Sequence, residues 1–134
     1  MTSLKAIEGI GTKNAEKLAR AGIRSTESLL AKGAKAKDRK TVAAESGIGE
    51  KQILDWVNRA DLFRVPGIGG QYSDLLEKAG VDTVVELAQR KAENLYAAMA
   101  DANAKSNLVN RLPSEGMVAG WIKAAKALRR EVEY

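Results

Sequence analysis

The chain has 134 residues, of which 45% are hydrophobic and only 4% aromatic, so it suits one ordinary domain or two small ones with a mainly aliphatic core. It contains neither cysteine nor histidine, which excludes disulfides, thiolate or imidazole metal ligands, and every nucleophile–base pair that needs either residue. The formal net charge of +5 modestly favours an anionic partner.

Three further patterns narrow the class of protein. No apolar run is long enough to span a bilayer, and the N-terminus lacks the basic-then-apolar pattern of a signal peptide. The acidic residues are scattered singly among lysines, without the clustered carboxylates expected of a metal-dependent nuclease. We therefore expect a soluble, cytoplasmic, monomeric and non-enzymatic protein, with no metal site and no obligatory cofactor.

The first predicted elements are short helices separated by glycine. Ser3 is placed to cap a short helix, and Thr12 to cap a second one. Gly22 is expected to end that second helix in the left-handed conformation. Ser25 or Thr26 is the expected cap of the helix that follows.

The next predicted elements follow the same pattern. Asp38 is placed to open a helix that the glycines at residues 47–49 interrupt, and apolar residues at helical spacing around Trp56 mark another helix. Nothing alternates with period two over a useful length. The sequence therefore predicts an all-α protein of about ten short helices.

The second half of the chain repeats the first. Residues 9–29 align without a gap on residues 67–87 and share three glycines and two leucines, and Trp56 later aligns on Trp121. The second copy has a longer segment at residues 97–110, which is predicted to be a lengthened helix. These coincidences indicate an internal duplication, with both tryptophans as core anchors.

The duplication sets the predicted boundaries. The first unit is expected to span residues 3–61 and the second residues 62–128, with residues 129–134 as a C-terminal tail.

The G-I-G turns carry the functional signal. The first glycine of such a turn can take a positive φ that ends one helix, while Ile10, Ile48 or Ile68 fills the core between two helices. The N–H groups that open the next helix then face outward with the positive end of its dipole. This geometry suits a phosphate group.

A helix, a G-x-G turn and a second helix resemble the helix-hairpin-helix motif. Gly9-Ile10-Gly11 would pair with Gly47-Ile48-Gly49, and Gly67-Ile68-Gly69 with a degenerate Leu112-Pro113-Ser114. The resemblance covers nearly the whole chain and implies two tandem (HhH)2-like units. In that family, paired hairpins hold phosphates on two strands across the minor groove largely without reading sequence, and a monovalent cation can sit on hairpin carbonyls.

A closer resemblance concerns two segments. The frame A-G-[IV]-x-[TS] after the first hairpin and the stretch LVNRLPSEGMVAGWIKAAKAL at residues 108–128 are similar to bacterial proteins of the domain-of-unknown-function 4332 family. That family is described as tandem helix-hairpin-helix repeats and has no established activity.

The two copies differ in charge. Two positions after the last residue of each turn stand Lys13 and Lys51 in copy one, but Gln71 and Gly116 in copy two. Of the 22 basic and 17 acidic residues, residues 1–61 hold 12 and 8, and residues 62–134 hold 10 and 9. Copy one is therefore the predicted anion-binding unit.

The leading hypothesis is sequence-independent binding of nucleic acid, above all duplex DNA, through its phosphates. The predicted contact residues are Gly9, Gly11, Thr12, Lys13, Gly47, Gly49, Glu50 and Lys51. A basic cluster would supply long-range attraction, and its predicted members are Lys32, Lys35, Lys37, Arg39 and Lys40. The alternative is a protein-interaction or scaffold module in which the hairpins only shape the fold and the basic cluster is an ordinary solvated face.

Overall fold

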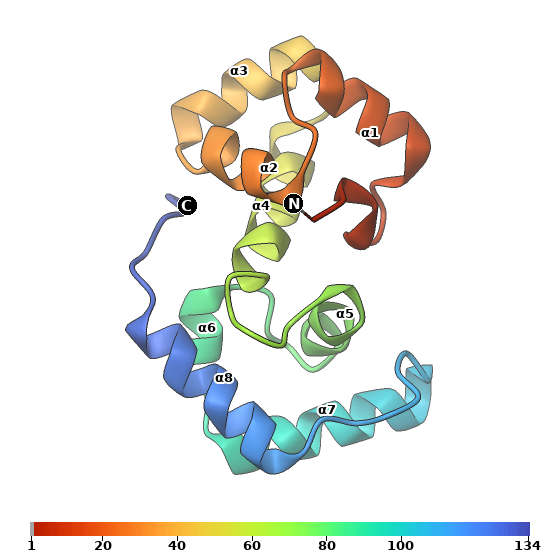
Figure 1. Ribbon diagram of the computed structural model, residues 1–134, viewed down its shortest axis with the longest axis vertical. Coiled ribbons are helices and arrows are strands. Elements are labelled where there is room, and N and C mark those ends of the chain that lie inside the picture. Colours follow the sequence, from red (N-terminus) through yellow and green to blue (C-terminus); the bar gives the residue numbers. More distant parts are fainter. Residues whose placement is uncertain (1) are drawn as a thin grey trace. The chain divides into compact units, whose positions relative to one another are not determined.

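A computed structural model describes residues 2–134, and all regular elements in that range are helical (Figure 1). The all-α prediction is confirmed, and residues 2–134 form eight α-helices and one 3-10 helix in place of the ten or so helices expected. In chain order they are η1 Leu4–Ala6, α1 Gly11–Arg20, α2 Thr26–Gly33, α3 Ala36–Ser46, α4 Glu50–Leu62, α5 Gly70–Lys78, α6 Val84–Gln89, α7 Ala92–Ser106 and α8 Glu115–Ala127.

The chain divides into two compact units. The first unit runs to Asp61 and also includes the closing segment Glu131–Tyr134, while the second unit is Leu62–Arg130. The last four residues, which the sequence places in a tail, are thus part of the first unit. Within residues 2–134, none of the helices combines the length and the apolar character that crossing a membrane requires.

The first unit is built around α3, which packs against both α1 and α2, while α1 also contacts η1. Its core is aliphatic, as the composition predicts, and Trp56 is the aromatic anchor with 4% of its surface exposed. The closing segment adds Val132, which is buried. The largest fully buried side chains of this unit are Ile7, Ile10, Leu18, Ile23, Leu29 and Ile53.

Local signals set several helix ends in the first unit. Ser3 caps η1 by accepting a hydrogen bond from the Lys5 N–H at 3.2 Å. Ser25 caps α2 in a reciprocal capping box with Ser28. Gly22 follows α1 with φ +79°, as predicted for a left-handed helix end.

Two helix starts differ from the prediction. Helix α1 begins at Gly11, so Thr12 lies inside its first turn instead of capping it. Helix α3 begins at Ala36 with Lys35 in the cap position, so Asp38 lies in its first turn. Helix ends commonly differ by one or two residues from the position of a capping residue, and both starts lie within that distance of the predicted caps.

The second unit packs α8 against α6 and α7, and α5 against α7. Trp121 is 4% exposed, which confirms its predicted place in the core, and its ring centroid lies 5.3 Å from that of Tyr72. Helix α7 has 15 residues, the lengthened helix that the sequence predicts, and it ends at Asn107 with φ +48°. Among the fully buried residues of this unit are Leu75, Leu76, Leu87, Leu95 and Met99.

Candidate nucleic-acid interface

The first glycine turn, residues 9–11, is held from within the chain. Gly9 and Gly11 have φ values of +93° and +57°, which side chains rarely adopt. Ile10 between them is only 1% exposed and fills the core as predicted. Asn14 donates from Nδ2 to the Gly9 carbonyl at 3.1 Å, a brace that the sequence pattern did not suggest. One carbonyl that a monovalent cation would use is therefore already an acceptor.

Helix α1 starts in the open. Gly11, Thr12 and Lys13 are all exposed. The residue in the cap position is Ile10, whose side chain makes no capping hydrogen bond. The N–H groups of a first helical turn have no partner inside the helix. Those of α1 therefore remain available to an acceptor from outside the chain.

The second glycine turn, residues 47–49, lies between α3 and α4. Gly47 ends α3 in the left-handed conformation with φ +78°, and its N–H donates to the Ala43 carbonyl at 2.9 Å. Ile48 is 8% exposed, and its own N–H donates to Ser46 Oγ at 3.2 Å. The turn is thus fixed up to Ile48 and open beyond it, since Gly49 and the two residues after it are exposed.

Gly49 differs from the other glycines of the first unit's turns. Its φ lies outside the left-handed region, so the backbone there accepts any residue. A Cβ on Gly49 would have no atom of the described chain within 4 Å beyond its immediate neighbours. Neither steric crowding nor backbone strain therefore requires a glycine at this position.

The residues after the second turn carry opposite charges. Glu50 opens α4 and Lys51 follows it, and both are exposed. A carboxylate at a helix start interacts favourably with the helix dipole, but it also repels a phosphate. Lys51 therefore has to offset Glu50 if an anion is to bind here.

The predicted basic cluster is only partly a solvent-facing surface. Arg39 is 4% exposed, and its guanidinium donates to the carbonyls of Gly33 at 2.8 Å and Ala34 at 3.0 Å. The same guanidinium donates to the Glu133 carbonyl of the closing segment. Arg39 therefore binds the end of α2 to the closing segment, and its assignment to a solvated cluster does not hold in the structure.

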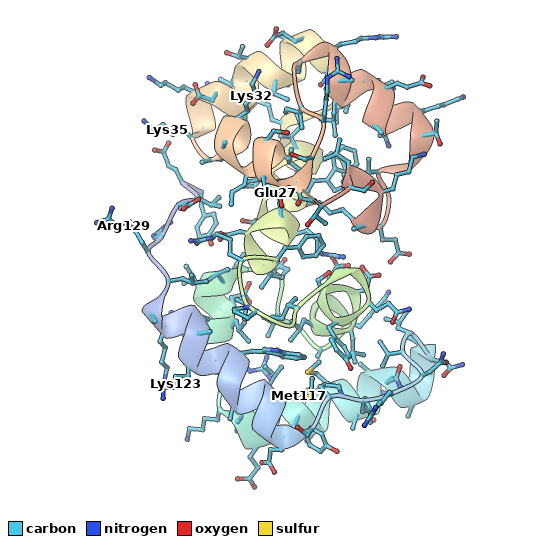
Figure 2. All side chains as sticks on the ribbon, in the orientation of Figure 1. Glu27, Lys32, Lys35, Met117, Lys123 and Arg129 are labelled. Carbon is cyan, nitrogen blue, oxygen red and sulfur yellow. The ribbon has the colours of Figure 1, made fainter. Side chains whose placement is uncertain are left out.

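The lysines of the cluster divide into two groups. Lys32 donates from Nζ to the Ala21 carbonyl at 3.0 Å, which satisfies a free acceptor at the end of α1. Lys35, Lys37 and Lys40 are exposed. Figure 2 shows Lys32 and Lys35 on the surface of the first unit. All four lysines of the cluster are thus exposed, but the ammonium group of Lys32 is bonded to the backbone.

The closing segment changes the charge balance of the units. Residues up to Asp61 carry 12 basic and 8 acidic side chains, and Glu131 and Glu133 raise the acidic count of the folded unit to 10. Its surplus therefore falls from four to two. Leu62–Arg130 keeps 10 basic and 7 acidic side chains, a surplus of three. The concentration of positive charge in the first half of the sequence does not persist in the folded units.

The glycine turns of the second unit are less suited to an anion. At the third turn, residues 67–69, Gly69 precedes α5 without a side-chain cap, but Gln71 stands where the first unit has lysine. At the fourth turn, residues 112–114, Ser114 accepts a hydrogen bond from the Met117 N–H at 3.1 Å. The start of α8 is therefore occupied by its own side chain.

The first and third turns share a contact that sequence reasoning missed. Gly9 and Gly67 have φ values of +93° and +91°. A Cβ on Gly9 would lie 3.8 Å from Trp56 Nε1, and a Cβ on Gly67 would lie 3.0 Å from Trp121 Nε1. The signal that could have predicted this pairing is that each copy has a glycine in its first turn and a single tryptophan in its last long helix.

Comparison with known proteins identifies a family. The family model for the Domain of unknown function (DUF4332) matches residues 8–128. Comparisons with curated proteins and with solved structures give no match. Because the family match spans nearly the whole chain, including all four turns, the protein belongs to the DUF4332 family.

Proposed function

We propose that the first unit is a helix-hairpin-helix module that binds the phosphate groups of duplex DNA without reading the base sequence. The observation that carries the proposal is the open start of α1. Gly11, Thr12 and Lys13 are exposed there, and the cap residue Ile10 makes no side-chain hydrogen bond to the helix. Backbone amides at such a position bind oxyanions, and the helix dipole adds to the attraction.

Lys13 makes this helix start suitable for a phosphate. It lies in the first turn of α1 and is exposed, so its ammonium group can reach the anion that the backbone amides bind. Lys51 has the same relation to the second turn. Two such sites in one unit would contact two phosphates, and phosphate contacts position a protein on DNA without reading bases.

Gly49 supports the use of the second turn. No contact or strain within the chain excludes a side chain there, and the absence of one leaves the Gly49 main chain open to close approach by another molecule. A DNA backbone that approaches the Gly49 main chain would be such a surface.

The second unit supports the helix-hairpin-helix assignment but takes a different role. Its Gly67 and Trp121 reproduce the geometry of Gly9 and Trp56, which supports a tandem duplication. Its turns are neutral or closed by Ser114. In this proposal the second unit keeps the fold of the module, a non-enzymatic cytoplasmic protein, while the first unit makes the phosphate contacts.

A second candidate is a protein-interaction module. The observation in its favour is that Arg39 and Lys32, two of the five predicted cluster members, are bound to backbone carbonyls. In addition, the closing segment lowers the positive surplus of the first unit. This candidate predicts no salt-dependent binding of duplex DNA.

A DNA titration separates the two candidates. A fluorescein-labelled duplex is titrated with protein at several salt concentrations. The two phosphates at the turns, with about two more neutralised by the exposed lysines of the basic cluster, predict a slope near −3.6 for log affinity against log salt, with micromolar or weaker binding at physiological salt. The double variant K13E/K51E is expected to weaken binding by at least about tenfold, which corresponds to about 1.4 kcal/mol.

The matched control is K123E/K126E, which makes the same change of net charge on α8 of the second unit. Lys123 and Lys126 are exposed, and Figure 2 shows Lys123 on the surface of α8. The control is expected to bind within about twofold of the unchanged protein, because in this proposal the second unit makes no phosphate contact. Equal losses in the two double variants would contradict phosphate binding at the glycine turns.

A further inference from the structure

The closing segment Glu131–Tyr134 is bound to the connection between α2 and α3. The Glu133 N–H donates to the Ala34 carbonyl at 2.7 Å, and the Arg39 guanidinium donates to the Glu133 carbonyl. Val132 beside it is 1% exposed. The chain thus returns after α8 and lies against α2 and α3 (Figure 1).

A carboxylate of this segment lies at the start of α3. Glu133 Oε1 accepts a hydrogen bond from the Ala36 N–H, the first amide of α3, at 3.3 Å. Lys35 precedes the helix and makes no capping hydrogen bond with its side chain. An N–H group in the first turn of a helix needs an outside acceptor, and a negative charge there is favoured by the helix dipole. Glu133 therefore occupies an anion position within its own chain.

The same helix start carries exposed lysines. Lys35 and Lys37 flank Ala36 and are exposed, and Lys40 follows one turn later. Asp38 is the acidic residue in the first turn of α3, and it is half-buried. The start of α3 thus resembles the start of α1 in that the cap residue makes no side-chain hydrogen bond and lysine is exposed nearby. It differs in that Glu133 accepts a hydrogen bond from its first amide.

The geometry points to the closing segment as an intramolecular competitor of the phosphate ligand. When the segment is in place, the Glu133 carboxylate takes the Ala36 amide and places negative charge beside Lys35 and Lys37. When a phosphate displaces that carboxylate, the start of α3 becomes a third backbone contact to DNA. This inference rests on the proposed function, since it concerns the same ligand and adds a regulated contact.

A phosphate would displace only the Glu133 side chain, because the rest of the segment is held by other contacts. The buried Val132 and the hydrogen bonds of the Glu133 main chain to Arg39 and Ala34 hold the segment, whereas the Glu133 carboxylate is held by the Ala36 N–H at 3.3 Å. A phosphate can therefore replace the carboxylate without removing Val132 from the core.

The test changes the charge of Glu133 in the full chain. E133Q keeps the length and an acceptor oxygen but removes the charge, and E133K reverses the charge. Both variants keep Val132 and Arg39. Duplex binding is expected to become about twofold to fivefold tighter in E133Q and tighter still in E133K, the range for one exposed charge near a phosphate. The salt slope is expected to steepen by about 0.9, which is one further phosphate.

The matched controls are E93Q and E93K. Glu93 is exposed in the first turn of α7, so these variants make the same charge changes at a helix start of the second unit. They are expected to leave duplex affinity within about twofold. Thermal melting of all four variants shows whether the fold is retained.

A second measurement follows the segment directly. In amide NMR spectra of the unchanged protein, addition of duplex is expected to shift the signals of Ala36 and Glu133 together with those of Thr12 and Lys13. Duplex binding that shifts only the α1 signals, or that is equal in E133Q and E93Q, overturns the inference and leaves the proposed function intact. Absence of duplex binding by every variant at low salt overturns both.

Discussion

The starts of α1 and α8 show how one kind of connection serves two purposes. Each follows a turn that packs an apolar residue, Ile10 or Pro113, into the core of its unit. At α1 the first amides remain open, whereas at α8 the Ser114 hydroxyl accepts the Met117 N–H. Packing of the turn and availability of the helix start are therefore separable properties. A chain can keep the fold of such a turn whether or not the amides of the next helix are bonded by its own side chain.

The largest expected effect concerns the glycines beside the tryptophans. Replacing either Gly9 or Gly67 by alanine puts a side chain at a φ above +90° and is expected to cost about 1–2 kcal/mol. The Cβ of Gly67→Ala would also crowd Trp121 Nε1 at 3.0 Å, which is expected to add about 1 kcal/mol. Urea denaturation followed by circular dichroism measures both losses.

A glycine on the outer face of α8 supplies the control for this comparison. Gly120 lies in the helix, and a Cβ there meets nothing within 4 Å among the described residues. Gly120→Ala is therefore expected to raise stability by up to about 1 kcal/mol. Equal losses of stability in Gly9→Ala and Gly67→Ala would contradict the extra cost of crowding at Trp121.

The next effect concerns binding more than stability. Alanine at Gly49 or Gly69 restricts the unfolded chain, which contributes about 0.4–1 kcal/mol. Alanine is also a poorer residue at a helix start, and this offsets a gain of that size. Both variants should therefore melt close to the unchanged protein.

In duplex titration the two variants should separate. Gly49→Ala is expected to weaken binding several-fold, because its methyl group stands between the main chain and the phosphate, whereas Gly69→Ala is expected to have no effect. If Gly49→Ala bound duplex as tightly as Gly69→Ala, close approach of DNA to the second turn would be excluded.

The smallest expected effect is on the pH dependence of stability. One carboxyl group in each unit has a shifted pKa, and the two shifts have opposite directions. The hydrogen bonds from the Thr2 N–H, at 3.0 and 3.2 Å, hold the pKa of Glu27 below its ordinary value. Hydrogen bonding with Asp82, together with burial, raises the pKa of Glu86. Both carboxyl groups lie in the first turn of a helix, α2 and α6 respectively.

The signs follow from proton linkage. Glu27 stabilises the fold above its unfolded pKa of about 4.3, and this contribution is lost as the pH falls below that value. Glu86 contributes in the opposite sense, since the folded state holds its proton more tightly and stability is lost as the pH rises above about 4.3. Melting curves of E27Q and E86Q between pH 3 and 7 should therefore show opposite changes in slope. Parallel curves would contradict this difference.

Local features of the fold were predictable from the sequence because they depend on neighbouring residues. Helical spacing and glycine φ preferences are short-range properties, and they placed Ile10, Ile48 and both tryptophans correctly in the core. The same short range explains the small errors at α1 and α3, where the helix starts lie within two residues of the predicted caps.

The candidate site was less predictable because two of its charges depend on distant contacts. Arg39 donates to the closing segment, 94 residues away, and Lys32 reaches the Ala21 carbonyl across 11 residues. Neither contact has a sequence signature. The open start of α1 was predictable, since it depends only on the turn that precedes it.

The position of Val132 and Glu133 in the first unit also has a consequence for biosynthesis. A ribosome makes the chain from its N-terminus, and domains generally fold as they emerge. Here the last residues that the first unit needs emerge only after every residue of Leu62–Arg130. Until then, the place of Val132 is empty and the Ala34 carbonyl has only Arg39 and water as donors. The unit made first is therefore the unit completed last.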